Sequence, residues 1–203
     1  MKILAVGRNY SEHIKELQNE KPTEPVIFMK PETALLKNNS PFYHPDFSNN
    51  IQYEVELIIR IHKEGKNIEE QFAHKYFDAV GIGIDFTARD LQEKAKEKGL
   101  PWTLSKGFNG SAPVSEFIPI SHFPDRRNIN FSLKVNGMEK QKANSNKMLF
   151  TFDQLIAYIS KFILLKKGDI IFTGTPAGVA KVNIGDHLEA FIENKKMLEL
   201  EVK

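Results

Sequence analysis

The sequence predicts an α+β protein in which strands predominate. Short apolar and β-branched runs recur along the chain, whereas only three segments carry helix start signals. Strands and helices do not alternate regularly, and no repeat of fixed period is present. With 203 residues the chain can build one good-sized core, so we expect a single domain over residues 1–203.

Composition limits the partners and the compartment. Lys and Arg total 28 against 26 Asp and Glu, and no run of five or more like charges occurs, so we expect no binding to nucleic acid or to an anionic membrane. The apolar runs fall far short of the ~20 residues of a membrane span, and the first is too short for a secretory signal. The chain has no cysteine, which excludes thiolate metal ligands. A cytoplasmic protein is the simplest interpretation.

The N-terminal region predicts a strand, a helix and an extended segment. Residues 3–6 are apolar and precede a glycine, which suits a short buried strand. Asn9 and Glu12 have the spacing of a capping box, so a helix should follow, with Ile14 and Leu17 on its inner side. Prolines then bracket an extended stretch at 26–29.

A long loop and two strands should come next. Residues 37–50 are rich in Asn, Ser and Pro, which predicts a loop that could serve as a lid. Residues 51–61 read as one strand because of their β-branched content, and residues 80–84 as a second. A helix over about 88–98 should follow the second strand.

Helix and turn signals organise the rest of the chain. Thr87 with Asp90, and Thr151 with Gln154, have capping-box spacing and so predict two helix starts. The remaining elements are strands at 131–135, 170–172, 187–193 and 197–202, an Asn-Gly hairpin turn at 136–137 and a glycine-rich turn at 173–178.

Three acidic residues form the first candidate site. Glu54 and Glu56 lie two apart on a predicted strand, so both project from one face, and such close carboxylates need a cation or a basic partner. A solvated polar strand face is the commoner explanation of this pattern. Asp85 ends the second apolar strand, where an Asx turn or a cap explains it equally well. Brought together, the three carboxylates would suit Mg²⁺ or Mn²⁺.

Other residues offer proton transfer and anion binding. His13 and Glu16 share a face of the first predicted helix, so Glu16 could orient His13 as a base; an exposed contact is the alternative. Arg89 and Gln92 share a face at the start of the second helix, where a carboxylate could dock, although a solvated face explains them too. Lys106 follows a segment too apolar for an ordinary surface lysine.

The turn at 173–178 could contribute a further contact. Thr175 can present a hydroxyl group, and its neighbours can present backbone N–H groups, to a ligand oxyanion. A tight connection between strands explains the same glycines. Their spacing matches neither a phosphate-binding loop nor a dinucleotide-binding motif.

Taken in order, the motifs resemble the fumarylacetoacetate hydrolase family. The segments that carry the resemblance are GRNYSEHIKE (7–16), YEVEL (53–57), DFTARDLQ (85–92), KGLPWTLSK (98–106) and TGTPAGV (173–179). The resemblance covers nearly the whole chain, and it is greatest to the short acylpyruvate hydrolase and oxaloacetate decarboxylase branch. It implies a strand-dominated mixed β-sandwich roll of the type found in the family's C-terminal domain, with a few short helices, and a homodimer.

The resemblance also implies a role for each candidate residue. It implies that Glu54, Glu56 and Asp85 bind Mg²⁺ or Mn²⁺, with Ca²⁺ able to take their place in crystals. It implies catalytic roles for His13, Glu16 and Lys106, and substrate binding by Arg8, Arg89, Gln92 and Thr175.

The expected activity follows from these roles. The chain should hydrolyse the C–C bond of acylpyruvates, decarboxylate oxaloacetate, or do both, through an enolate stabilised by the cation and Lys106. The expected partner is thus a small 2-oxo acid. Tautomerisation or isomerisation of oxaloacetate or of 2-hydroxy-diene-dioates is the alternative enzyme activity. A non-catalytic, metal-dependent dicarboxylate binder is the alternative from another class.

Overall fold

Four β-sheets make up the framework of the computed structural model, which describes residues 1–16 and 20–203. The largest sheet has six strands in the order β2-β1-β12-β5-β6-β9. Strand β1 pairs in parallel with β12, and the other pairs are antiparallel. The strands are β1 (Ile3–Gly7), β2 (Val26–Lys30), β5 (Val55–Ile61), β6 (Phe77–Ile84), β9 (Ile118–Pro119) and β12 (Ile170–Phe172).

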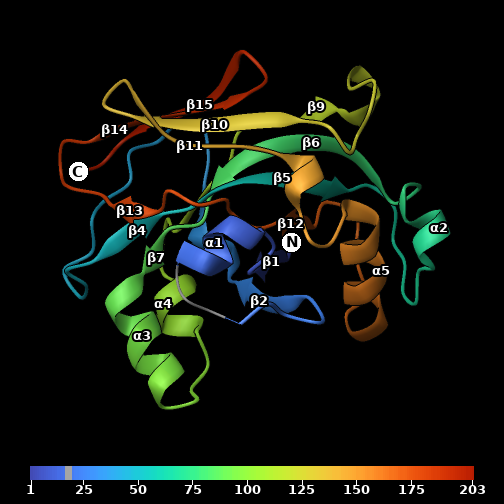
Figure 1. Cartoon of the computed structure of the whole chain (residues 1–203), viewed down its shortest axis with the longest axis horizontal. Coiled ribbons are helices and arrows are strands. Elements are labelled where there is room, and N and C mark those ends of the chain that lie inside the picture. The colour runs from blue at the N-terminus through green and yellow to red at the C-terminus, as the bar shows by residue number, and fades with distance from the viewer. Residues whose placement is uncertain (17–19) are drawn as a thin grey trace.

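A four-stranded antiparallel sheet packs against the largest sheet over β5 and β6 (Figure 1). Its order is β11-β10-β14-β15. Leu133 and Ala190 from this sheet share one buried core with Leu57 and Ile82 from β5 and β6. Alternate residues of β14 are buried, as expected for a sheet with one face in the core. The strands are β10 (Asn130–Val135), β11 (Met138–Asn144), β14 (His187–Ile192) and β15 (Lys195–Glu201).

Two small sheets complete the framework, and one of them shows that the single strand predicted over residues 51–61 is wrong. Residues 51–61 form two strands, because β4 pairs with β7 and β13 in one sheet while β5 pairs with β6 and β12 in another. The chain therefore leaves one sheet and enters the next at Glu54. The short strands are β4 (Ile51–Tyr53), β7 (Thr87–Ala88) and β13 (Ala180–Lys181), with β3 (Leu35–Leu36) paired to β8 (Ala112–Pro113).

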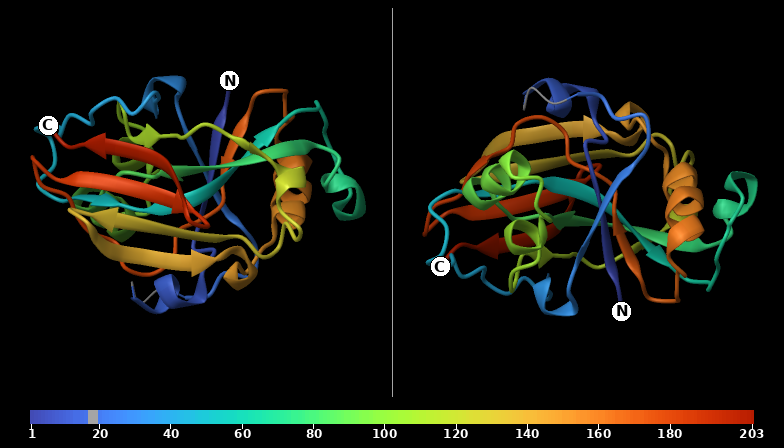
Figure 2. Two further views of the ribbon diagram at one scale, coloured as in Figure 1. Left: turned by 90° about the horizontal axis from the view of Figure 1, so that it is seen from above. Right: turned by 90° about the horizontal axis from the view of Figure 1, so that it is seen from below.

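Short helices lie at the edges of the sheets. Helices α3 and α4 project together from one side, and α5 lies at the end opposite the C-terminus (Figures 1 and 2). The sequence did not predict α2 and α4, because four residues are too few to show a helical period. The helices are α1 (Ser11–Glu16), α2 (Glu70–Ala73), α3 (Arg89–Glu97), α4 (Thr103–Lys106) and α5 (Phe152–Phe162).

One of the three predicted capping boxes forms. Thr151 and Gln154 make both reciprocal bonds at the start of α5. The prediction at Asn9 is wrong, because its buried side chain donates to the carbonyls of Phe150 and Thr173 instead. The prediction at Thr87 is also wrong: residue 88 is the N-cap of α3, and its side chain makes no capping hydrogen bond. The Asn9 side chain thus connects segments far apart in the chain, whereas the Thr87 hydroxyl donates to the Asp85 carbonyl and accepts from Lys106.

The predicted Asn-Gly hairpin turn agrees with the structure. Asn136 and Gly137 have φ of +52° and +77°, the left-handed values of a type I′ turn, and join β10 to β11. The predicted inner residue Leu17 lies outside the described residues. No helix in the described part of the chain is long and apolar enough to cross a membrane.

Candidate active site

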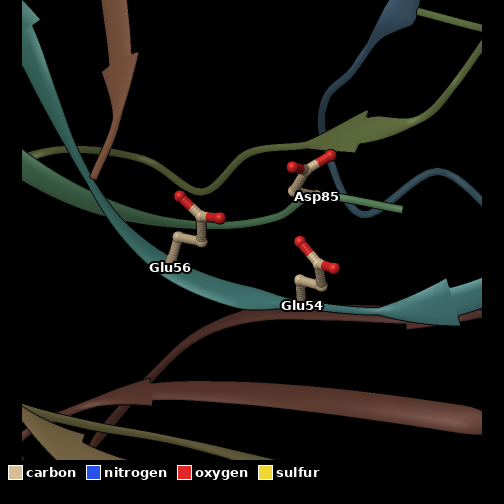
Figure 3. Close-up of side chains that lie close together, drawn as sticks. All are labelled: Glu54, Glu56 and Asp85. Carbon is tan, nitrogen blue, oxygen red and sulfur yellow. The ribbon is translucent and has the colours of Figure 1, made fainter. Parts of the chain in front are cut away.

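Three buried carboxylates converge where β5 begins and β6 ends (Figure 3). One oxygen each of Glu54, Glu56 and Asp85 lies within 4.8 Å of the others. Antiparallel pairing sets Val55 opposite Ile84, and the Asp85 N–H donates to the Glu54 carbonyl at 2.8 Å, which places Asp85 beside the two glutamates. The structure therefore brings together the three acids that the sequence singled out.

Lys106 projects from α4 into this carboxylate cluster. Its Nζ donates to Glu54 Oε2 at 2.8 Å, to Asp85 Oδ2 at 2.7 Å and to Thr87 Oγ1 at 2.6 Å. Burial alone would lower the pKa of Lys106, but the Asp85 and Glu54 carboxylates outweigh it and raise that pKa. Lys106 is thus a buried, charged ammonium in contact with two of the three acids.

A second buried lysine supports the cluster from behind. Lys30 Nζ lies 2.6 Å from Asp85 Oδ1 and donates to the carbonyls of Phe86, Lys106 and Ser111. Its side chain has no solvent exposure. Lys30 was not among the predicted site residues, although a lysine at the end of an apolar strand and just before a proline is a signal of burial.

Neighbouring charges give the two buried glutamates different protonation states. Burial on its own raises the pKa of Glu54, but Lys106 and Arg89 outweigh it and hold that pKa below the ordinary value. The pKa of Glu56 is raised well above its ordinary value by burial and by the Asp85 and Glu54 charges. The largest effect that opposes this rise in the pKa of Glu56 is the hydrogen bond that its Oε2 accepts from the Gly174 N–H at 2.6 Å. Glu54 is therefore ionised, whereas Glu56 favours its protonated form.

The donor set fits a hard divalent cation. Carboxylate oxygens are the ligands that Mg²⁺ and Mn²⁺ prefer. Among the described side chains, the buried Asp85 Oδ1 has no partner with hydrogen-bond geometry, despite its close contact with Lys30. Glu56 lacks an ion pair in the same described part of the chain, so its charge is the one that a cation would best neutralise. Glu54, Glu56 and Asp85 together can hold a metal ion.

His13 and Glu16 form a pair on α1. His13 Nδ1 lies 3.1 Å from Glu16 Oε2, and the other Glu16 oxygen accepts the Gly178 N–H at 3.0 Å. Burial lowers the pKa of His13, although Glu54 and Glu16 oppose this effect. The imidazole is thus neutral near pH 7, and a proton on Nδ1 directed at Glu16 leaves Nε2 as the basic nitrogen.

Arg89 and Gln92 lie side by side on α3. Arg89 Nη1 donates to Gln92 Oε1, Nη2 donates to Glu54 Oε1, and Nε donates to Gln52 Oε1 at 2.8 Å. All three guanidinium nitrogens therefore have protein partners. A carboxylate that docks here has to take over some of these contacts.

Thr175 is held by the protein rather than presented freely. Its hydroxyl donates to the Val55 carbonyl at 2.9 Å and accepts from Gln141 Nε2 at 2.9 Å. The hydroxyl therefore has to exchange one of these contacts to donate to a ligand. Thr175 lines the cavity, and its contact with substrate stays a prediction. Gln141, which the sequence analysis missed, also donates to the Pro176 carbonyl and so fixes the glycine-rich turn.

One cavity collects nearly all of the predicted site residues. Nine of the ten line it, and Glu16 lies behind His13. The cavity also has lining residues that the sequence analysis missed, namely Phe28, Lys96 and Trp102. The predicted residues that line it are Arg8, His13, Glu54, Glu56, Asp85, Arg89, Gln92, Lys106 and Thr175.

Comparison with known proteins agrees with this arrangement. Residues 2–203 match the family model described as fumarylacetoacetate hydrolase C-terminal. The mouse (Mus musculus) protein "oxaloacetate tautomerase FAHD1, mitochondrial" is 42% identical over 201 residues, which are 99% of this chain and 91% of that protein. The Dictyostelium discoideum "oxaloacetate decarboxylase, mitochondrial" is 45% identical over 192 residues, which are 94% of this chain and 88% of that protein.

A solved structure shares both the fold and the sequence pattern. Fumarylpyruvate hydrolase from Pseudomonas aeruginosa, solved with Mn²⁺ and pyruvate, superposes with a TM-score of 0.94 at 32% identity. The match covers 100% of this chain and 89% of that one. The predicted strand-dominated α+β fold is thereby confirmed. On sequence and structure alike, the chain belongs to the fumarylacetoacetate hydrolase family.

Proposed function

We propose that the chain is a divalent-metal-dependent enzyme that cleaves C–C bonds in short 2-oxo acids. It hydrolyses acylpyruvates to a carboxylate and pyruvate, and it decarboxylates oxaloacetate. The observation that carries this proposal is the three-carboxylate cluster with Lys106 and the His13–Glu16 pair at one cavity. The names of the similar proteins, an oxaloacetate decarboxylase and a fumarylpyruvate hydrolase, support it.

Each group at the cavity has a part in this chemistry. Glu54, Glu56 and Asp85 would hold Mg²⁺ or Mn²⁺, which would act as a Lewis acid and polarise the 2-oxo group. Arg89 and Gln92 bind the 1-carboxylate after Arg89 exchanges protein contacts for the substrate. The Lys106 ammonium stabilises the negative charge that develops on the 2-oxo oxygen.

His13 moves the proton in hydrolysis. Oriented by Glu16, it removes a proton from a water molecule, whose oxygen adds to the distal carbonyl carbon. The C–C bond then breaks, its electron pair passes to the pyruvate enolate, and protonation of the enolate carbon completes pyruvate. Decarboxylation of oxaloacetate releases CO₂ and forms the same enolate, but it consumes no water.

Tautomerisation of oxaloacetate is the second candidate, because the mouse relative bears that name. The same residues could serve it, with His13 moving a proton between carbon and oxygen and Lys106 stabilising the enolate oxygen. A non-catalytic dicarboxylate binder has no need of a buried base with its own orienting carboxylate. We therefore place enzyme activity ahead of simple binding.

Assembly, compartment and domain organisation belong to the same proposal. The family resemblance supports a homodimer, and light scattering during size-exclusion chromatography would measure it. We propose a cytoplasmic location, which cell fractionation would test, since two similar proteins are named mitochondrial. We also propose that residues 1–203 fold as one domain, for which one cooperative unfolding transition is the expected result.

His13→Ala tests the proposed base. We expect hydrolysis of acetylpyruvate with Mg²⁺ to fall by about 10²–10⁴. Oxaloacetate decarboxylation should fall less, because it consumes no water. Mn²⁺ affinity should persist, because His13 is not one of the proposed metal ligands. His187→Ala, which changes the half-exposed His187 of β14, is the matched control and should leave both activities intact. Equal losses on the two substrates would contradict the role, and a wild type that binds 2-oxo acids without turnover would favour the binder.

A further inference from the structure

Helix α3 presents a row of polar residues to the cavity. Arg89, Gln92 and Lys96 are spaced three and four residues apart, which places them on one face of the helix, and all three line the cavity. At a rise of about 1.5 Å per residue, Lys96 lies about 10 Å along the helix axis from Arg89 and about 6 Å from Gln92. The row therefore leads away from the carboxylate cluster.

The far end of this row meets the turn that follows β1. Lys96 Nζ lies 5.8 Å from the centre of the Trp102 ring, and that ring packs against Gly7, where an added Cβ would come within 3.5 Å of Cζ3. The next residue, Arg8, lines the same cavity and has φ of +60°. This left-handed conformation is uncommon for a residue with a side chain and often marks a functional position.

The two cations at this end differ from those around the acids. Within residues 1–16 and 20–203, Arg8 and Lys96 take part in no ion pair or side-chain hydrogen bond, whereas Arg89 and Lys106 both contact Glu54. Lys96 is half-buried. Its pKa is lowered by burial and then by the nearby positive charges of Arg89 and Arg8. Glu54 opposes this effect from a distance. Positive charge thus accumulates there without a carboxylate in direct contact among the described residues.

We propose that Lys96 and Arg8 form a second carboxylate subsite, which makes the site selective for 2-oxo acids that carry a distal carboxylate. The inference rests on the proposed function, with the 1-carboxylate at Arg89 and Gln92. A separation of one to two helical turns, about 5–10 Å, suits the two ends of a short dicarboxylate. Oxaloacetate and fumarylpyruvate belong to this class, whereas acetylpyruvate has a single carboxylate.

A purely structural role for Lys96 makes a different prediction. Its aliphatic stem could simply cover Trp102 while the ammonium reaches solvent. Lys96→Met keeps a flexible, unbranched side chain against the ring and removes only the charge. Lys98→Met is the matched control, because Lys98 ends the same helix and is exposed. Lys96→Arg should retain the preference, because it restores the charge.

Binding can be measured without turnover. Isothermal titration calorimetry with Mn²⁺ present would compare pyruvate, which has one carboxylate, with 2-oxoglutarate, which has two. We expect the wild type to bind 2-oxoglutarate more tightly, and Lys96→Met to lose about 10-fold to 100-fold in affinity for it, the scale of a charge-assisted hydrogen bond. Its affinity for pyruvate should not change. In kinetics, the kcat/KM ratio of fumarylpyruvate to acetylpyruvate should fall by a similar factor.

The outcomes separate this inference from the proposed function. If the wild type binds pyruvate with Mn²⁺ but shows no preference for 2-oxoglutarate, the subsite is refuted while the proposed function stands. Equal losses in Lys96→Met and Lys98→Met would also refute it, because general charge would then explain the effect. If pyruvate does not bind at all in the presence of Mn²⁺, the proposed function itself fails.

Discussion

Two clusters of charged residues in this protein combine lysines with carboxylates, one in a buried position and the other on the exposed surface. The buried charge cluster consists of Glu54, Glu56, Asp85, Lys30 and Lys106. The exposed charge cluster, on β14 and β15, consists of His187, Glu189, Lys196 and Glu199. In each, a lysine contacts two carboxylates, but the Lys106 side chain is 3% exposed and that of Lys196 is 45% exposed.

Burial changes what such contacts do to protonation. In the exposed cluster, hydrogen bonding to Lys196 lowers the pKa of Glu199, and bonding to Glu199 raises the pKa of Lys196, so both favour their charged forms. In the buried cluster the same chemistry keeps Glu54 ionised, but burial raises the pKa of Glu56 and favours its neutral form. In the buried cluster, Glu56 therefore becomes ionised readily only when a further positive charge, such as a metal cation, lies beside it.

The largest expected effect comes from breaking the buried cluster at Lys30. Lys30→Met removes the ammonium next to Asp85 and leaves a buried carboxylate without that partner. We expect the free energy of unfolding of the chelator-treated protein to fall by about 3–5 kcal/mol. Urea denaturation followed by circular dichroism would measure it.

Lys196→Met is the matched change in the exposed cluster. Water and mobile side chains replace its contacts, so we expect no measurable loss of stability. A similar loss in both variants would show that burial does not distinguish the two clusters.

An intermediate effect is expected from a change at Glu16. It distinguishes the buried His13–Glu16 pair from the exposed His187–Glu199 pair. Burial holds the pKa of His13 below its ordinary value, and the hydrogen bond and charge of Glu16 partly offset this. Glu16→Gln should therefore lower the pKa of His13 further, so the acid limb of the kcat/KM profile moves to lower pH. The plateau should fall about 10-fold to 100-fold, because an orienting partner is lost.

The pH profile of acetylpyruvate hydrolysis, with NMR titration of His13, would test this prediction. Glu199→Gln, next to His187, is the matched control and should leave the profile unchanged. Movement of the acid limb to higher pH would be incompatible with the assigned contacts.

The smallest effect is a pH dependence of stability that has opposite signs in the two clusters. The pKa of Glu56 is raised in the folded state, so its contribution is complete below the unfolded pKa and is lost as pH rises through the folded pKa. The slope for one proton is at most about 1.4 kcal/mol per pH unit. The pKa of Glu199 is lowered, so its contribution is present above the unfolded pKa and is lost as pH falls.

Unfolding measured across pH in the presence of a chelator would reveal this contrast. Glu56→Gln should remove the decline toward high pH, and Mn²⁺ should remove it in the wild type. Glu199→Gln should leave that decline in place. If stability without metal did not fall as pH rises above the unfolded pKa of Glu56, Glu56 could not be the carboxylate that needs a cation.

Local signals and family-like motifs predicted much of the site and the fold. The Asn136-Gly137 turn and the Thr151 cap formed as expected, because each depends on contacts within a few residues. The predictions failed where a side chain had a distant partner. Asn9 bonds to Phe150 and Thr173 rather than to its own helix, and no pattern near residue 9 could show this.

By itself, the sequence determined which residue types were available and which of them would share a strand or helix face. Only the tertiary structure decided that the chain changes sheets at Glu54, that β5 and β6 pair in the register that sets Asp85 beside it, and that Lys30 closes the cluster from behind. The physical reason is that burial and pairing partners, which set the pKa of each acid, arise from segments far apart in the chain. Composition and spacing contain no measure of how much water remains at a position once those segments meet.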